Sequence, residues 1–204
     1  MSVFKDFKTM PTVQFQRQTI QEGRIPLHFA ALQDNVDMGK LLISAGSNIN
    51  AVDLHGNTPL HNSCYHNSPK FTTLLISKGA LLDLQSKNRD TPLDYATEAG
   101  HLEIVKSLIN AGAKVNLAGE NNWTPLHNAA SITRKVAIEI VTLLLKAGAN
   151  PAAKSGDGQY PCDVAENATV KALLVEAKSQ AHIHESLLME PGILSSRDSV
   201  SLKT

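Results

Sequence analysis

A Pro-Leu pair that recurs every 33 residues limits what this chain can fold into more than any other feature. The four pairs begin at Pro26, Pro59, Pro92 and Pro125. A glycine keeps the same phase, 20 residues after each of the first three prolines, at Gly46, Gly79 and Gly112. A constant period of this length indicates one supersecondary unit that is copied along the chain. The sequence therefore predicts a solenoid, in which each unit packs only against its neighbours.

The third unit shows how one copy is predicted to fold. Thr91 suits an N-cap and Pro92 suits the first helical position, where the missing N–H of proline costs nothing. A short inner helix follows and ends before Gly100. Apolar residues at helical spacing over 102–109 then predict an outer helix, which ends at Gly112. Neither helix can bury its apolar stripe alone, so stacking of neighbouring units must complete the core.

The residues around the four prolines are alike in type as well as in spacing. They read Ile25-Pro26-Leu27-His28, Thr58-Pro59-Leu60-His61, Thr91-Pro92-Leu93-Asp94 and Thr124-Pro125-Leu126-His127. At this period, these segments resemble the signature of the ankyrin repeat. The resemblance implies an all-α ankyrin-repeat solenoid of stacked helix-turn-helix units with protruding β-hairpin loops. It also implies a non-catalytic module or adaptor that presents a concave surface to a protein partner.

The phase of the repeat divides the chain into five units with a segment at each end. The units are expected at residues 20–52, 53–85, 86–118, 119–154 and 155–176. The fourth is three residues longer than the others, with the extra residues near Ile132, and the fifth is shortened like an end cap. Residues 1–19 are expected to cap the first repeat with a short helix. Residues 177–204 are expected to form a C-terminal helix and a flexible, Ser-rich tail.

The composition excludes several classes of partner. Nineteen basic and 19 acidic residues give a formal net charge of zero, so no overall basic field favours nucleic acid. No apolar run approaches the ~18 residues that a membrane span needs, and the N-terminus does not read as a signal peptide. Cys64 and Cys162 lie three repeats apart, so no bridge between them is expected. We therefore expect a cytoplasmic protein that is monomeric alone and binds neither nucleic acid nor membrane.

The chain departs from the family pattern at several positions. Asp94 and Asp163 replace the common histidine. Arg89 and Asn122 replace the hairpin glycine, and arginine tolerates positive φ poorly, so the hairpin before the third repeat is predicted to be altered or strained. The segment 62–64 reads Asn-Ser-Cys where the family has small apolar residues. This substitution predicts a more polar and less stable second repeat.

The eight histidines do not predict a metal site. His28, His61 and His127 are the signature histidines, which in the family hydrogen-bond the backbone between repeats. His55, His61 and His66 lie near Cys64, and a zinc site there is conceivable. No CxxC or HxxxH pair supports it, so we expect no metal and no cofactor.

One catalytic alternative involves a cysteine. Cys64 beside His66 could imitate a thiol nucleophile with its base. Cys64 stands, however, where the repeat has a small buried alanine, which favours a packed thiol. The chain also has no nucleotide-binding or serine-hydrolase motif. We therefore expect that the protein is not an enzyme. A catalytic site near Cys64 and His66 remains the less favoured hypothesis.

The resemblance also implies where a partner binds. In the family, the hairpin tips and the exposed ends of the inner helices form one concave face that usually contacts the partner. Apolar or aromatic residues among these positions are informative, because a purely solubilising surface would be charged. The positions carried over from the family as partner-binding candidates are Leu54, His55, Asn57, Tyr65, His66, Lys87, Asn88, Asp90, Glu98, Glu120, Asn121, Trp123 and Ile132.

Two biological settings remain open for such a module. One is an ordinary cytoplasmic adaptor. The other is an effector, because the chain also resembles the small ankyrin proteins that intracellular bacteria deliver into host cells. In that case it would act on a host protein in the host cytoplasm, and the polar tail at 195–204 would suit a translocation signal.

Overall fold

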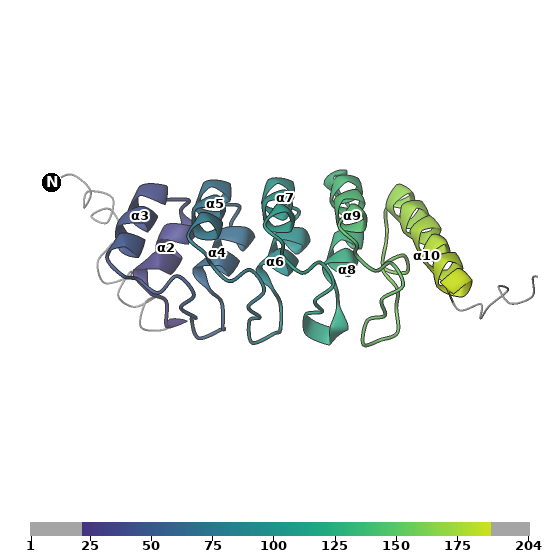
Figure 1. The fold of residues 1–204 in the computed structure, drawn as a ribbon, viewed down its shortest axis with the longest axis horizontal. Helices are drawn as coiled ribbons and strands as arrows, with labels where there is room; N and C mark the ends of the chain where they lie inside the picture. The colour runs from purple at the N-terminus through teal and green to yellow at the C-terminus, as the bar shows by residue number, and fades with distance from the viewer. Residues whose placement is uncertain (1–21, 189–204) are drawn as a thin grey trace, which may run out of the picture.

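The computed structural model describes residues 22–188 of the chain, with side chains as far as residue 181. Helix pairs stand side by side in a row, and a single long helix closes one end (Figure 1). The inner helices are α2 (Pro26–Leu32), α4 (Pro59–Tyr65), α6 (Pro92–Ala99) and α8 (Pro125–Ala130). The outer helices are α3 (Val36–Ser44), α5 (Pro69–Ser77), α7 (Leu102–Asn110) and α9 (Val136–Lys146). The closing helix is α10 (Ala168–Leu188).

The helices form two layers. Each inner helix contacts the next inner helix, from α2 through α4 and α6 to α8. Each outer helix likewise contacts the next, and α10 packs on α9. This arrangement confirms the all-α solenoid that the 33-residue period predicts. The leucine after each signature proline is buried in every repeat, so these leucines form a continuous column through the core: Leu27, Leu60, Leu93 and Leu126.

The inner helices begin where the sequence predicts. Thr58 and Thr91 accept a hydrogen bond from the backbone N–H three residues ahead, and proline occupies the first helical position. Ile25 stands at the same place in the first repeat and makes no side-chain cap. Its backbone N–H instead donates to Nδ1 of His28 at 3.1 Å. The missing threonine therefore removes one cap contact but not the start of the helix.

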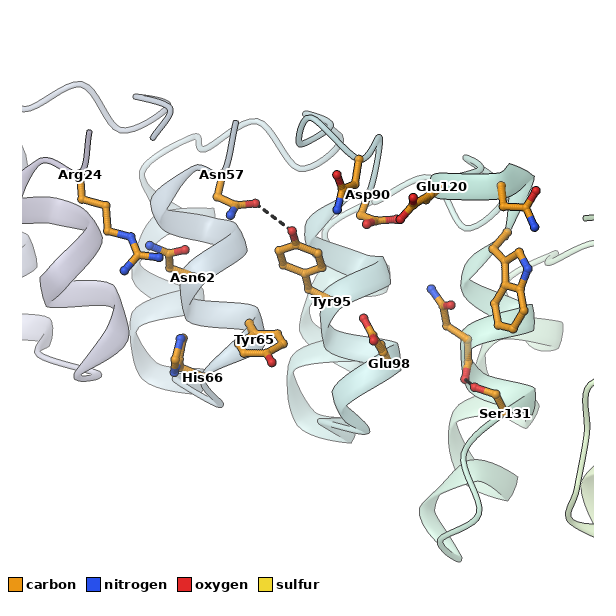
Figure 2. Close-up of a pocket in the computed structure, with 14 residues that line it drawn as sticks. Arg24, Asn57, Asn62, Tyr65, His66, Asp90, Tyr95, Glu98, Glu120 and Ser131 are labelled. Carbon is orange, nitrogen blue, oxygen red and sulfur yellow. Dashed lines mark hydrogen bonds between the residues drawn. The ribbon is translucent and has the colours of Figure 1, made fainter. Parts of the chain in front are cut away.

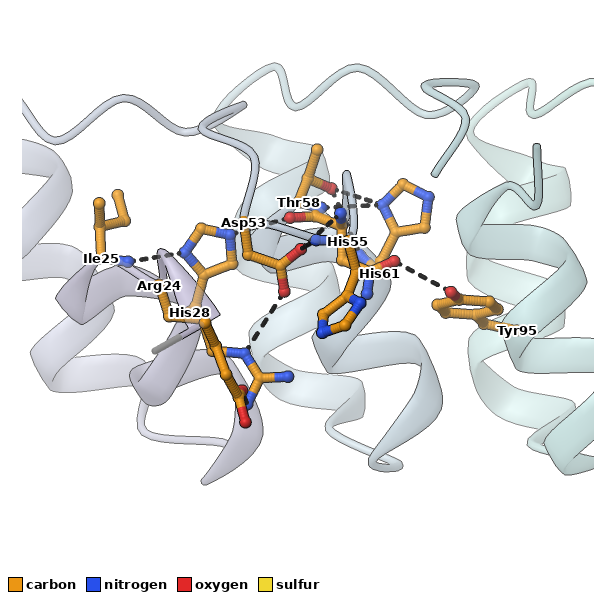
Figure 3. A network of polar contacts seen from close by, with 10 residues as sticks. Arg24, Ile25, His28, Asp53, His55, Thr58, His61 and Tyr95 are labelled. Atoms are coloured by element: carbon orange, nitrogen blue, oxygen red, sulfur yellow. Dashed lines mark hydrogen bonds and ion pairs between the residues drawn. The ribbon is translucent and has the colours of Figure 1, made fainter. Parts of the chain in front are cut away.

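The signature histidines connect one repeat to the next (Figure 3). Nε2 of His28 lies 3.0 Å from the carbonyl oxygen of Asn57, and Nε2 of His61 lies 3.1 Å from that of Asp90. His127 makes the same contact with Gln159 at 3.1 Å. Because a carbonyl can only accept, Nε2 carries the proton and Nδ1 accepts from the backbone at the start of the helix. These contacts support the structural role expected for the histidines.

Loops protrude between the repeats along one edge of the row (Figure 1). No β-strand is assigned within residues 22–188, although backbone pairs such as Ser86 N–H to Asp90 O at 2.9 Å close the loops. Arg89 has φ of 69° and occupies the left-handed region that Gly56 occupies in the preceding loop, at 77°. The turn therefore has the same left-handed conformation in both loops. In the third repeat it is sterically strained, because a residue with a Cβ is unfavourable at positive φ.

The longer fourth repeat carries its extra residues between α8 and α9, as expected. Arg134 in this connection donates from Nη2 to the carbonyl oxygen of Ala99 at 2.6 Å. The insertion thus supplies a hydrogen-bond donor to a carbonyl group at the C-terminal end of α6, in the preceding repeat. In the fifth unit, a turn at residues 160–163 replaces the inner helix, and α10 follows. The expected helix at the N-terminus and the expected tail from residue 195 lie outside the described residues.

The polar segment of the second repeat is largely satisfied inside the core. Ser63 Oγ donates to the carbonyl oxygen of Leu60 at 2.9 Å, and Thr72 Oγ1 donates to Ser63 Oγ at 2.9 Å. Cys64 is fully buried beside them. Asn62 differs, because its buried Nδ2 has no hydrogen-bond partner among the described residues. An unsatisfied buried donor costs about 1–3 kcal/mol of folding free energy. The lower stability predicted for this repeat is therefore attributed to the Asn62 side chain alone.

Candidate protein-binding groove

A groove of about 610 Å³ crosses the inner helices and the bases of the loops (Figure 2). It extends from Arg24 in the first repeat to Ser131 in the fourth. Its lining mixes aromatic, amide and charged side chains. The lining residues are Arg24, Asn57, Asn62, Tyr65, His66, Asn88, Asp90, Tyr95, Glu98, Glu120, Asn121, Trp123, Asn128 and Ser131.

Most of the lining follows the repeat period. One set lies two residues before the signature proline and comprises Arg24, Asn57, Asp90 and Trp123. A second set lies three residues after the proline and comprises Asn62, Tyr95 and Asn128. A third lies six residues after it and comprises Tyr65, Glu98 and Ser131. Because the repeats stack in register, residues 33 apart in sequence become neighbours along the groove.

Nine of the thirteen residues predicted from the sequence line this groove. They are Asn57, Tyr65, His66, Asn88, Asp90, Glu98, Glu120, Asn121 and Trp123. Leu54, His55 and Lys87 lie exposed on the loop tips outside it. The expectation that Ile132 is a surface residue is wrong, because its side chain is only 7% exposed. The longer connection after α8 directs Ile132 into the core instead of along the groove.

Sequence reasoning did not select five lining residues as candidates: Arg24, Asn62, Tyr95, Asn128 and Ser131. The repeat phase could have found four of them. Asn62, Tyr95 and Asn128 share the third position after their prolines, and Ser131 shares the sixth with Tyr65. Arg24 carries a weaker signal, because it lies at the edge of the first repeat, where the signature begins irregularly.

Aromatic rings form part of the groove wall. Tyr65 is 55% exposed, and its ring packs edge-on against that of Tyr95, with 5.9 Å between the ring centroids. The Tyr95 hydroxyl donates to Oδ1 of Asn57 at 3.0 Å, which fixes the ring over the second repeat. Trp123 is half-buried, with its ring 5.7 Å from that of His127. The tryptophan is thus partly packed on its own repeat rather than standing free on a loop tip.

The fourth loop is held on both sides. It contains a short 3₁₀ helix, η2 (Glu120–Asn122), in which Asn121 takes a left-handed conformation with φ of 49°. The Glu120 N–H donates to Oδ1 of Asp90 at 3.2 Å, toward the third repeat. Asn121 Nδ2 donates to Oδ2 of Asp157 at 2.7 Å, toward the fifth. These contacts fix the loop residues that line the groove.

The charges in the groove are unevenly paired. Arg24 is held by Glu22 at 2.5 Å and by Asp53 at 3.4 Å, so carboxylates outside the lining offset its charge. Asp90, Glu98 and Glu120 also line the groove. Within the part of the chain that the structure describes, none of these three carboxylates forms an ion pair. Burial raises the pKa of Asp90, and the nearby Glu120 carboxylate raises it further.

The described residues do not favour a catalytic or metal site. Burial raises the pKa of the Cys64 thiol to about 12, which disfavours the thiolate that nucleophilic attack requires. The pKa of His66 is lowered by partial burial and by the positive charges of Arg24 and His101. Among residues 22–188, no group of three histidine, cysteine, aspartate or glutamate side chains could hold a metal ion. The fully buried position of Cys64 therefore favours the packed thiol expected from the repeat pattern over a nucleophile.

The fold and the groove define a class of protein, a helical repeat solenoid with a preformed groove across its inner helices. Comparison with known families identifies it further: a family model described as "Ankyrin repeats (3 copies)" matches residues 8–86 and 74–155. The chain belongs to the ankyrin-repeat family, whose members generally act as protein–protein interaction modules. A search of curated proteins finds no match. Over the described residues, no helix has the length and apolar character of a membrane span.

Proposed function

We propose that this protein is a non-catalytic adaptor that binds a protein partner in the groove across its inner helices. The observation that carries the proposal is the composition of the groove. Aromatic, amide and carboxylate side chains from three successive repeats, the second to the fourth, line one continuous surface, and the first repeat adds Arg24. Tyrosine and tryptophan are the residue types that most often anchor protein interfaces.

The scaffold supports this function because its groove is formed before a partner binds. The histidine contacts between repeats and the bonds that hold the fourth loop place the groove side chains without any partner. A partner would therefore bind a preformed surface and lose little ordering entropy on the adaptor's side. Loop residues Leu54, His55 and Lys87, outside the groove, could extend the contact at its rim.

Site-specific photo-crosslinking tests the proposal. A p-benzoylphenylalanine residue is placed at Tyr65, in the groove, or at Leu41, on the outer helix α3. The two positions make a matched pair, because their side chains are 55% and 50% exposed. In lysate of the cells that express the protein, the groove position should crosslink to a defined protein, and the outer position should not. Equal products from both positions would reject the groove as the binding face.

We further propose a cytoplasmic setting and a monomeric state. Cys64 and Cys162 are both free and buried, which suits a reducing compartment. The effector alternative depends on the tail at 195–204, which lies outside the described residues. Deletion of 195–204 separates the two settings. An effector whose tail is a translocation signal should lose delivery into host cells while keeping its melting temperature, whereas an ordinary adaptor should keep both melting and partner binding.

A further inference from the structure

We propose that the groove recognises an arginine or lysine side chain carried by an extended segment of the partner. This inference rests on the proposed function and adds the chemistry of the partner. Three features of the groove carry it: carboxylates without a cation, aromatic walls, and one buried donor without an acceptor.

The carboxylates come from two neighbouring repeats. Asp90 and Glu98 belong to the third repeat and Glu120 to the fourth, and all three line the same cavity. Arg24 is already engaged by Glu22 and Asp53 and lies at the far end of the groove (Figure 2). A guanidinium or ammonium group in the groove would therefore meet negative charge that no described residue neutralises. Charge-assisted hydrogen bonds to these oxygens are among the stronger contacts available to a partner.

The aromatic rings suit the same ligand. Tyr65 and Tyr95 stand on adjacent inner helices, edge to face, and Glu98 lies on the same helix as Tyr95 (Figure 2). Trp123 lies in the fourth repeat beyond Glu98 and Asp90. Cations are attracted to the faces of such rings, most strongly to tryptophan. The long apolar stem of arginine or lysine would also cover the exposed ring of Tyr65.

Asn62 indicates that the occupant is a peptide rather than a free cation. Its side chain is only 4% exposed, it lines the groove, and its Nδ2 has no hydrogen-bond partner in the described structure. This donor needs an acceptor, which a metal ion or a simple amine does not offer. The backbone carbonyl of an extended segment does. A segment along the groove thus supplies an acceptor for Asn62 and a cation for the carboxylates.

Selection from a library of random 12-residue peptides displayed on phage tests the inference. The wild-type protein is compared with the double variant Glu98→Gln/Glu120→Gln. The matched control is Glu139→Gln/Glu166→Gln, which makes the same change of charge at exposed positions outside the groove. Wild type and control should select peptides enriched in arginine or lysine. The groove variant should lose this enrichment.

One selected peptide is then measured by fluorescence anisotropy. Replacement of its basic residue by neutral citrulline (for arginine) or norleucine (for lysine) should weaken binding about tenfold or more, equivalent to about 1.4 kcal/mol. Asn62→Leu should weaken it too, while Glu139→Gln should not. Peptides that bind in the groove, as shown by loss of binding to Tyr65→Ala, but lack basic enrichment would overturn this inference and leave the proposed function intact. Peptides that Tyr65→Ala binds unchanged would overturn both.

Discussion

Asn128 donates from Nδ2 to Oδ1 of Asp94 at 3.3 Å, and Asp94 occupies the position at which the first, second and fourth repeats have a histidine bound to a backbone carbonyl. Asp94 lacks the imidazole N–H with which His61 donates to the next repeat, and it accepts a hydrogen bond across the interface instead. Its other oxygen accepts from the N–H and hydroxyl of Thr91 at 2.9 and 2.7 Å. The third and fourth repeats are therefore joined by an amide–carboxyl contact at the groove wall.

The burial of Asp94 makes stability depend on pH. The pKa of Asp94 is raised to about 7, mainly by burial and also by the Asp90 and Glu98 carboxylates, while hydrogen bonds from Thr91 oppose the rise. The folded state thus keeps a proton that the unfolded state has lost between about pH 4 and 7. The free energy of unfolding contributed by this group therefore falls as pH rises through that window.

Asp94→Asn should remove this dependence. At pH 8 the free energy of unfolding of the variant should exceed that of wild type, and this difference should shrink as pH falls to 5. The difference between the two pH values should be about 1.4 kcal/mol for each unit by which the pKa of Asp94 is raised. Urea unfolding at both pH values measures the difference. The buried neutral histidines act with the opposite sign below pH 6.5, but they are the same in both proteins. Asp163→Asn, at the exposed equivalent position in the fifth repeat, is the control and should show no such pattern.

Arg89 offers a second stability test. Its φ of 69° is a conformation that costs a residue with a Cβ roughly 1–2 kcal/mol. Arg89→Gly should therefore raise the free energy of unfolding by about 1 kcal/mol, allowing for the greater chain entropy of glycine. Arg89→Ala removes the same charge but keeps the Cβ, so it should give no comparable gain. Equal gains from both variants would show that charge, not backbone strain, limits this loop.

The repeat unit could be predicted from the sequence because its local signals agree. A proline marks the start of each inner helix and a glycine follows the end of each outer helix, and the helices of residues 26–146 begin and end close to these marks. The expected positions of the signature histidines also hold, because their contacts follow from the register of one repeat on the next. The local sequence signals and the stacking of the repeats therefore favour the same structure.

The remaining site features depend on contacts that no local pattern encodes. Ile132 looks like a groove residue by phase, yet three inserted residues change the path of its loop and bury it. The pairing of Arg24 with Asp53 joins residues 29 apart, and it decides that Arg24 does not neutralise the groove. The unpartnered amide of Asn62 likewise depends on what surrounds it. Such features require the packed structure.

Trp123 should contribute mainly to binding and modestly to stability. Its ring is half-buried on His127, so Trp123→Ala should lower the free energy of unfolding by only about 1 kcal/mol. Partner affinity should fall at least about tenfold, as for a typical aromatic anchor. Thermal melting and binding are measured on the same samples. Trp123→Phe keeps a ring over His127 and should restore melting. Full partner binding by the alanine variant would remove Trp123 from the site.

Leu108 tests whether the array behaves as a chain of nearest neighbours. It is fully buried in α7, at the centre of the row, and Leu173 is half-buried in the closing helix α10. Leu108→Ala should cost about 2–5 kcal/mol, because a central repeat supports interfaces on both sides. Leu173→Ala should loosen α10 alone.

Amide hydrogen exchange distinguishes the two effects. In Leu108→Ala, protection should fall in α5 and α9 as well as in α7, because these outer helices contact α7 directly. In Leu173→Ala, the loss should be confined to α10 and to the side of α9 on which it packs. If both substitutions lowered protection equally along the whole row, the array would unfold as a single unit. The nearest-neighbour description of its stability would then fail.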